Sequence, residues 1–346
     1  MGFDIGIAKL SKLLRAAIII VFLLISLSVL AIATPIDTLA QGRLDFRLQN
    51  GTPTATPVTD AKGQLLYRNN QALYTIMADG SAPTPVNLGT GFNSLCGVWS
   101  HDGRQIAVIG GATEFGLYIE PTSGGTPRSL IKALPTKDTK TSPVDTPIGL
   151  AAWAPDGKTI AYISQSGALY LLNVSDGKQK AKLTTIRFFS VDWSPDGKQF
   201  VAFGQDTTNK IGLFTLAIDG SALQPLVSLT DADLTLALSS DHFFNRDTVL
   251  PRWSPDGTQV SYAAWGDDGI AGVYIVSATN GANPKRVSDA KLSTYGASWS
   301  ADGKYLAYTI DSGPQRAITI TDLSQPRFGP IAEVTSGGCP VWKPGK

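Results

Sequence analysis

One short repeat recurs along most of the chain and limits what the chain can fold into. A tryptophan is followed by Ser-Pro-Asp-Gly or a close variant and then by an apolar run, as in WSPDGKQFVAFG from Trp193. Successive copies begin between 40 and 60 residues apart. The tryptophans that lead the copies are Trp99, Trp153, Trp193, Trp253, Trp299 and Trp342. Repeats of this length, built from short strands, are typical of a β-propeller.

Each copy predicts four short strands joined by tight turns. The first strand ends at the tryptophan, and Pro, Asp and Gly then form a turn: Pro presets φ, Asp bonds back to the backbone and Gly accepts positive φ. The second strand is apolar throughout, as at residues 160–164 and 200–203, which indicates burial on both faces. The third strand carries a pair such as Leu169-Tyr170, and an Asp-Gly or Asn-Gly turn leads to the fourth.

The two ends of the repeat array are out of phase, and this predicts how the ring closes. The array begins with a second strand at residues 65–69 and ends with a first strand at residues 339–342. These fragments together make one blade. We therefore predict an all-β, six-bladed propeller over residues 63–346 in which the last strand completes the first blade. Such closure leaves no open sheet edge.

The N-terminal segment is typical of an exported protein. Residues 16–36 form an uncharged, mostly apolar run that predicts a hydrophobic helix, and residues 1–15 form a basic flank on its cytoplasmic side. The length favours a transmembrane anchor, whereas Ala31-Ile32-Ala33 matches a signal-peptide cleavage site, so both alternatives stay open. Residues 37–62 are rich in Thr and Pro and predict an extended tether. Either alternative places the propeller outside the cytoplasm, membrane-anchored or secreted after cleavage near Ala33.

The composition argues against several classes of function. The chain has 29 Lys and Arg against 28 Asp and Glu, and this balance does not favour a nucleic-acid partner. Two histidines and two cysteines leave little material for a metal site or for acid–base chemistry. Asp267-Asp268-Gly269 offers carboxylates to a calcium ion but lacks the regular ligand spacing of a calcium loop. We expect neither a metal nor a cofactor.

The repeats also resemble a known family. The copies at residues 193–198 (WSPDGK) and 253–257 (WSPDG) are similar to the WD40-like (PD40) repeats of TolB-type propellers and of the prolyl oligopeptidase and dipeptidyl peptidase IV group. TolB proteins carry an α/β domain before the propeller, whereas a tether stands there in this chain. The peptidases carry a G-x-S-x-G nucleophile, and the nearest string, residues 296–300 (GASWS), lacks the final glycine. The resemblance implies a fold rather than a substrate.

The long connections point to one face of the ring as the candidate binding surface. The connections between strands 2 and 3, and between strand 4 and the next blade, share that face, and two long ones run over residues 131–148 and 229–250. Aromatic rings with a few charges suit a peptide or a sugar. The candidate ligand-binding residues are Phe92, Arg187, Phe188, Phe189, Asp241, His242, Phe243, Phe244, Arg246, Trp265, Asp267 and Tyr295. The alternative is that the phenylalanines pack between the blades.

The two cysteines occupy equivalent places. Cys96 and Cys339 each precede a repeat tryptophan by three residues, on the inner strands of neighbouring blades. Inner strands converge near the axis, which brings their backbones towards disulfide reach. Outside the cytoplasm an oxidised pair is permitted. We hypothesise a disulfide that pins the C-terminal strand, with two buried free thiols as the alternative.

These observations favour a non-enzymatic scaffold in the cell envelope that binds a protein or a peptide. The chain has no paired histidines and no recognisable catalytic constellation. One alternative is a propeller that binds a carbohydrate or polysaccharide through the same aromatics. A weaker alternative is a lyase or hydrolase centred on His242. The membrane is an expected partner through the N-terminal helix.

Overall fold

The structure is a computed structural model, and the part that it describes belongs to one compact unit, residues 53–346. The described residues are 60–112, 115–132, 147–238, 250–289, 291–311, 316–324, 328–334 and 337–345. The hydrophobic segment at residues 16–36 and nearly all of the tether lie outside these ranges. Within these ranges no helix combines the length and the apolar character needed to cross a membrane.

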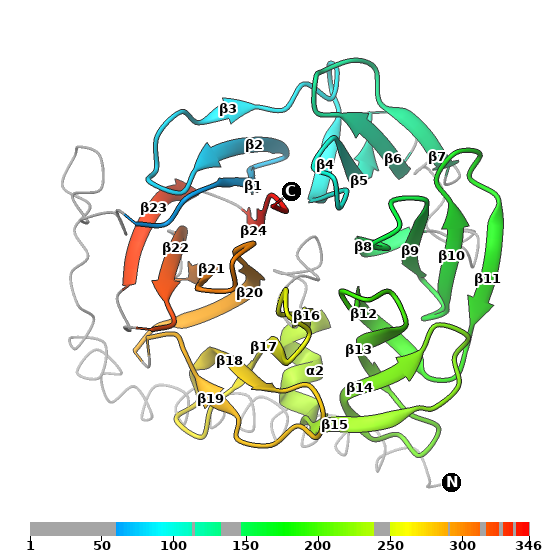
Figure 1. The fold of residues 1–346 in the computed structure, drawn as a ribbon, viewed down its shortest axis with the longest axis vertical. Coiled ribbons are helices and arrows are strands. Elements are labelled where there is room, and N and C mark those ends of the chain that lie inside the picture. The colour runs from blue at the N-terminus through cyan, green and yellow to red at the C-terminus, as the bar shows by residue number, and fades with distance from the viewer. Residues whose placement is uncertain are drawn as a thin grey trace, which may run out of the picture. The chain divides into compact units, whose positions relative to one another are not determined.

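Six four-stranded antiparallel sheets form the blades of a propeller (Figure 1). The inner strands are β24 (Gly337–Trp342), β4 (Asn93–Trp99), β8 (Pro147–Trp153), β12 (Arg187–Trp193), β16 (Arg252–Trp253) and β20 (Ser293–Trp299). The second strands are β1 (Gln64–Asn69), β5 (Gln105–Gly111), β9 (Thr159–Ser164), β13 (Gln199–Gln205), β17 (Gln259–Trp265) and β21 (Tyr305–Asp311). We number the blades 1 to 6 in this order. Every inner strand ends at a repeat tryptophan, as the repeat predicts.

The remaining strands complete each blade towards its outer edge. The third strands are β2 (Ala72–Met77), β6 (Gly116–Pro121), β10 (Leu169–Asn173), β14 (Ile211–Ala217), β18 (Ala271–Ser277) and β22 (Arg316–Asp322). The outer strands are β3 (Thr84–Pro85), β7 (Arg128–Lys132), β11 (Gln179–Leu183), β15 (Gln224–Ser228), β19 (Lys285–Arg286) and β23 (Phe328–Val334). One helix among the described residues, α2 (Asp231–Leu238), follows β15.

Blade 1 is built from both ends of the repeat array. Strand β24 pairs antiparallel with β1, and Leu65 lies opposite Trp342 in that register. In Figure 1 the red C-terminal strand accordingly lies beside the blue first strand. The prediction of a six-bladed propeller closed by its last strand is therefore confirmed.

The hydrophobic core lies between the blades. Each pair of neighbouring blades encloses one buried cluster of described residues. The cluster that closes the ring packs Tyr305 and Ile318 of blade 6 against Leu65 and Ile76 of blade 1. Because every blade is covered on both sheet faces, its second strand is buried along most of its length, and all six residues of β9 are buried. Burial on both faces explains why these strands read as continuous apolar runs.

The repeat turn uses its own polar groups. In the copy that follows Trp193, the Ser194 hydroxyl donates to Asp196 Oδ1 at 2.7 Å, and the Lys198 N–H donates to the same oxygen at 3.1 Å. Gly197 has a φ of 70°, which a residue without a Cβ adopts most readily. The bond from Ser194 is the main cause that lowers the pKa of the Asp196 carboxyl. The Ser and Asp of the repeat therefore build the turn.

The repeat tryptophans join each blade to the one before it. The Trp193 indole N–H donates to the Ala152 carbonyl at 3.1 Å, one residue before the tryptophan of blade 3. The same bond recurs from Trp99, Trp153 and Trp299 to Val341, Val98 and Arg252. For Trp253 and Trp342 the link is made instead by the backbone N–H, which donates to the side chains of Asp192 and Ser298 respectively. At every junction a repeat tryptophan thus donates at least one hydrogen bond that links one inner strand to the next.

Candidate functional site

The two faces of the ring differ in how their polar side chains are hydrogen-bonded. On the face with the Asp-Gly turns, Ser and Asp side chains of the repeat bond to each other within the turn. The opposite face, which we call the loop face, carries the 2–3 turns and the connections between blades. A pocket of about 580 Å³ opens there between blades 3 and 4. It is the candidate site.

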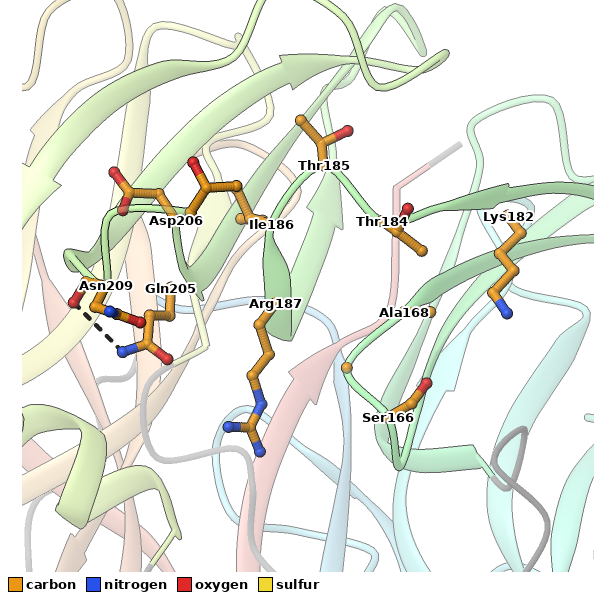
Figure 2. Close-up of a pocket in the computed structure, with 12 residues that line it drawn as sticks. Ser166, Ala168, Lys182, Thr184, Thr185, Ile186, Arg187, Gln205, Asp206 and Asn209 are labelled. Atoms are coloured by element: carbon orange, nitrogen blue, oxygen red, sulfur yellow. Dashed lines mark hydrogen bonds between the residues drawn. The ribbon is translucent and has the colours of Figure 1, made fainter.

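Three loops supply the lining of this pocket (Figure 2). They are the 2–3 turn of blade 3 at residues 166–168, the connection between the blades at residues 184–187, and the 2–3 turn of blade 4 at residues 205–207. Lys182 at the end of the outer strand β11 and Asn209 complete the wall. The lining is rich in hydroxyl and amide groups, with two cations and one acid.

Arg187 is held in place by its neighbours. Its guanidinium lies over the Phe189 ring, 5.3 Å from the centroid. The Phe188 N–H donates to the Gly167 carbonyl at 2.8 Å, which ties the blade 3 turn to β12. A Cβ at Gly167 would stand only 2.6 Å from Arg187 Cγ, so the absence of a side chain there lets the turn pack on the arginine stem. Figure 2 shows the guanidinium between the loop of Gln205 and Asn209 and the turn of Ser166.

The single acid of the pocket belongs to its own turn. Asp206 Oδ1 accepts hydrogen bonds from the Thr208 N–H and hydroxyl, both at 2.8 Å, and from the Lys210 N–H at 2.9 Å. The bond from the Thr208 side chain is the main cause that lowers the pKa of this carboxyl. Within the described part of the chain no ion pair joins Asp206 to Arg187. The guanidinium N–H groups of Arg187 can therefore donate to a group of a ligand.

Trp265 anchors the helix that follows β15. Its backbone N–H donates to Asp233 Oδ1 at 2.8 Å, and its indole donates to the Ala232 carbonyl at 3.1 Å. The helix begins with a reciprocal cap, because the Thr230 hydroxyl donates to Asp233 Oδ2 and accepts from the Asp233 N–H. This helix lies within residues 229–250, which the repeat pattern predicts to be a loop, although Thr230-Asp231-Ala232-Asp233 carries the signal for this cap. The Trp265 side chain remains 38% exposed on the loop face.

Three of the five described aromatic residues predicted for this face lie in the core. Phe188, Phe189 and Tyr295 are 0%, 5% and 2% exposed. Phe92 is half-buried against the edge of Tyr118, with ring centroids 5.2 Å apart. The Tyr295 hydroxyl donates to Asp311 Oδ2 at 2.5 Å. These rings offer no broad surface to a ligand, which is the packing alternative of the sequence analysis.

Other candidate residues are dispersed. Asp267 is exposed, and its neighbour Asp268 forms an ion pair with Arg286 at 3.0 Å. Across the described residues no group of three His, Cys, Asp or Glu side chains is placed to hold a metal. Five candidates lie outside the described residues, namely Asp241, His242, Phe243, Phe244 and Arg246. Among the candidates that the structure describes, Arg187 alone lines the pocket.

The two cysteines are joined across the closure of the ring. Cys96 in β4 and Cys339 in β24 form a disulfide with their Cα atoms 5.9 Å apart. Both residues are 3% exposed and belong to the cluster that also contains Val98. The bond ties the closing strand of blade 1 to the inner strand of blade 2.

One buried acid has no hydrogen-bond partner among the residues that the structure describes. Glu120 in β6 is 1% exposed, and neither carboxylate oxygen has a hydrogen-bond partner. It lies opposite Ile106 in the register of β5 and β6, on the sheet face that packs towards blade 1. Burial raises the pKa of this carboxyl. The charged form is therefore a cost to the folded state.

Glu120→Gln is expected to stabilise the protein at neutral pH and to have little effect in acid. Because the folded-state pKa of Glu120 is raised, its contribution to stability is full below the unfolded-state pKa and is lost as the pH rises through the folded-state value. Removing the charge should add about 1 kcal/mol to the free energy of unfolding at pH 7. Urea unfolding of both proteins at pH 7 and pH 4 measures this. An equal difference at the two pH values would contradict it.

No family model matches the chain. An uncharacterized protein of Agrobacterium fabrum is 27% identical over 218 residues, which cover 60% of this chain and 64% of that protein. The Tol-Pal system protein TolB of Alcanivorax borkumensis is 33% identical over 66 residues, 19% of this chain and 15% of that protein. The chain thus spans less than two thirds of the length of these relatives.

Solved structures share the fold over most of the chain. TolB from Acinetobacter baumannii superposes with a TM-score of 0.62 and 19% identity, covering 82% of this chain and 67% of that one. A chain of the nidogen–laminin complex gives a TM-score of 0.58 at 12% identity, covering 81% and 98%. The tricorn protease gives 0.55 at 14% identity, covering 79% and 25%. The resemblance of the repeats to TolB-type propellers thus extends to the fold.

Proposed function

We propose that this protein is a non-enzymatic scaffold whose loop face binds a protein or a peptide. The observation that carries the proposal is the pocket between blades 3 and 4, where Arg187 is held by packing while its donors remain unpaired among the described residues. A held side chain loses little conformational entropy when it binds. On the opposite face, the Ser and Asp side chains of three repeat turns bond to one another instead.

The fold and one serine support this proposal. A propeller of this kind occurs in TolB and in a chain of a protein–protein complex, so the fold permits a binding role. Ser298, in the string nearest to a hydrolase nucleophile, accepts the Trp342 N–H at 3.0 Å and so takes part in closing the ring. Its role there is structural. The lyase or hydrolase alternative then rests on His242, which lies outside the described residues.

The carbohydrate alternative is less well supported. A sugar site commonly presents a ring face to the ligand, and three of the five candidate rings that the structure describes pack in the core. Trp265 is the one candidate ring with substantial exposure among those described.

The proposed location is the cell envelope, outside the cytoplasm. The basic flank and apolar run of residues 1–36 are typical of export. A disulfide such as Cys96–Cys339 persists in oxidising compartments, which supports the same location. The mass of the intact mature protein tells whether the apolar run is retained as an anchor or removed near Ala33.

Site-specific photo-crosslinking of the full chain in cells tests the binding role. A photoreactive phenylalanine analogue at Thr207 lies on the loop face, and the matched control at Lys178 lies in a turn on the opposite face. We expect an adduct of one defined mass from Thr207 and none from Lys178. Absence of any adduct from the loop face, or the same adduct from both positions, would overturn the proposal.

A further inference from the structure

We propose that the pocket between blades 3 and 4 binds the carboxylates of an acidic peptide segment, with Arg187 as the anchor and Lys182 as the second cation. This inference rests on the proposed function and names the chemistry of its ligand. It starts from the placement of these two cations in one pocket on the loop face.

Arg187 has the geometry of a carboxylate anchor. A guanidinium presents a planar fork of N–H donors that matches the two oxygens of a carboxylate. Here the stem lies beside Gly167 and the guanidinium over Phe189, and these two contacts restrain a side chain that is exposed to a ligand. In the described part of the chain no acid forms an ion pair with it. The ligand is expected to supply the missing anion.

The charge around the pocket favours an anion. Asp206 Oδ1 accepts hydrogen bonds from three donors of its own turn, and these bonds stabilise the conformation of that turn. Lys182 also lines the pocket, and its ammonium lies over the Tyr170 ring, 5.1 Å from the centroid. Two cations in one pocket speed the encounter with an acidic partner.

The remaining lining favours a peptide over a sugar. It holds hydroxyls and amides at Ser166, Thr184, Gln205 and Asn209, which can bond to peptide groups, and it contains no aromatic side chain. A space of about 580 Å³ accommodates a few side chains of an extended segment. The occupant that these features fit is a short acidic stretch of a protein partner.

Fluorescence polarisation with defined peptides tests the inference. The probes are fluorescein-labelled eight-residue peptides with zero, two or four glutamates on a Gly-Ser-Ala background, and a matched glutamine series. The protein is the full chain in detergent. We expect affinity to rise at least tenfold from zero to four glutamates, to fall with added salt, and to stay low for the glutamine series.

Variants assign the binding to the pocket. Arg187→Gln should weaken binding of the four-glutamate peptide about tenfold, and Lys182→Gln, on an exposed side chain, should weaken it by a smaller factor. Lys198→Gln, in a turn on the opposite face, is the charge-matched control and should bind like the unaltered protein. The affinity of Arg187→Lys for this peptide should lie between those of Arg187→Gln and the unaltered protein, because lysine keeps the charge but lacks the planar fork of N–H donors.

Two results would overturn the inference. One is equal binding of the glutamate and glutamine series, or an Arg187→Gln variant that binds normally while its thermal unfolding is unchanged. The other is Arg187-dependent binding of an oligogalacturonate but of no peptide, which would make the ligand an acidic sugar. If the peptides fail while the Thr207 adduct persists, the loop face still binds a partner and only the ligand chemistry is wrong.

Discussion

Replacing both Cys96 and Cys339 by serine is expected to lower the free energy of unfolding by about 3–5 kcal/mol. The disulfide joins residues 243 positions apart, so in the unfolded state it closes most of the propeller sequence into one loop. Constraining so long a loop removes much of the entropy of the unfolded chain. The bond also fixes β24, which is otherwise held by its pairing with β1, by its hydrogen bonds with Trp99 and Ser298, and by packing. Urea unfolding of the oxidised protein and of the double variant measures the loss.

Reductant supplies the control for this prediction. The unaltered protein treated with dithiothreitol should unfold at the same urea concentration as the double variant, and the double variant should not respond to dithiothreitol. Limited proteolysis should cleave near residue 337 earlier in the variant, because the closing strand opens first. A double variant as stable as the oxidised protein would show that packing alone holds the closing strand.

The fold was predictable because the repeat shows which strand of a blade each segment forms. The array starts at a second strand and ends at a first strand, and only a ring that pairs β24 with β1 uses both fragments. The hydrogen bonds by which the repeat tryptophans join neighbouring blades could not be predicted in the same way. That Trp193 donates to Ala152, whereas Trp253 uses Asp192, depends on how neighbouring inner strands are offset.

The candidate site was harder to predict than the fold. Consecutive residues of an inner strand face the two neighbouring inter-blade cores, so Phe188 packs with blade 3 and Phe189 with blade 5. A pair of adjacent aromatics is therefore a core signal in this architecture, although it reads as a binding motif in a loop. The pocket is built from single polar residues, such as Lys182 and Gln205, that come from separate strands without a common motif.

Asp192→Ala is expected to cost about 3–5 kcal/mol of unfolding free energy, because it leaves the Arg252 guanidinium buried without its partner. Asp192 joins the inner strands of blades 4 and 5: Oδ1 accepts from Arg252 Nη1 at 3.1 Å and Oδ2 from the Trp253 N–H at 3.0 Å. The two side chains are only 19% and 12% exposed. Burial raises the pKa of the Asp192 carboxyl, and the arginine opposes that shift. Urea unfolding at pH 7 measures the loss.

A double-mutant cycle separates this link from a general loss of packing. If the pair is coupled, Arg252→Ala in the Asp192→Ala background should cost at least 1 kcal/mol less than it does alone. Asp192→Asn should cost less than Asp192→Ala, because the amide oxygen can still accept the Trp253 N–H. Lys178→Ala breaks an ion pair whose side chains are 83% and 40% exposed, and it should change stability by less than about 0.5 kcal/mol. Additive costs for Asp192 and Arg252 would mean that β16, only two residues long, is held by its neighbours rather than by this bond.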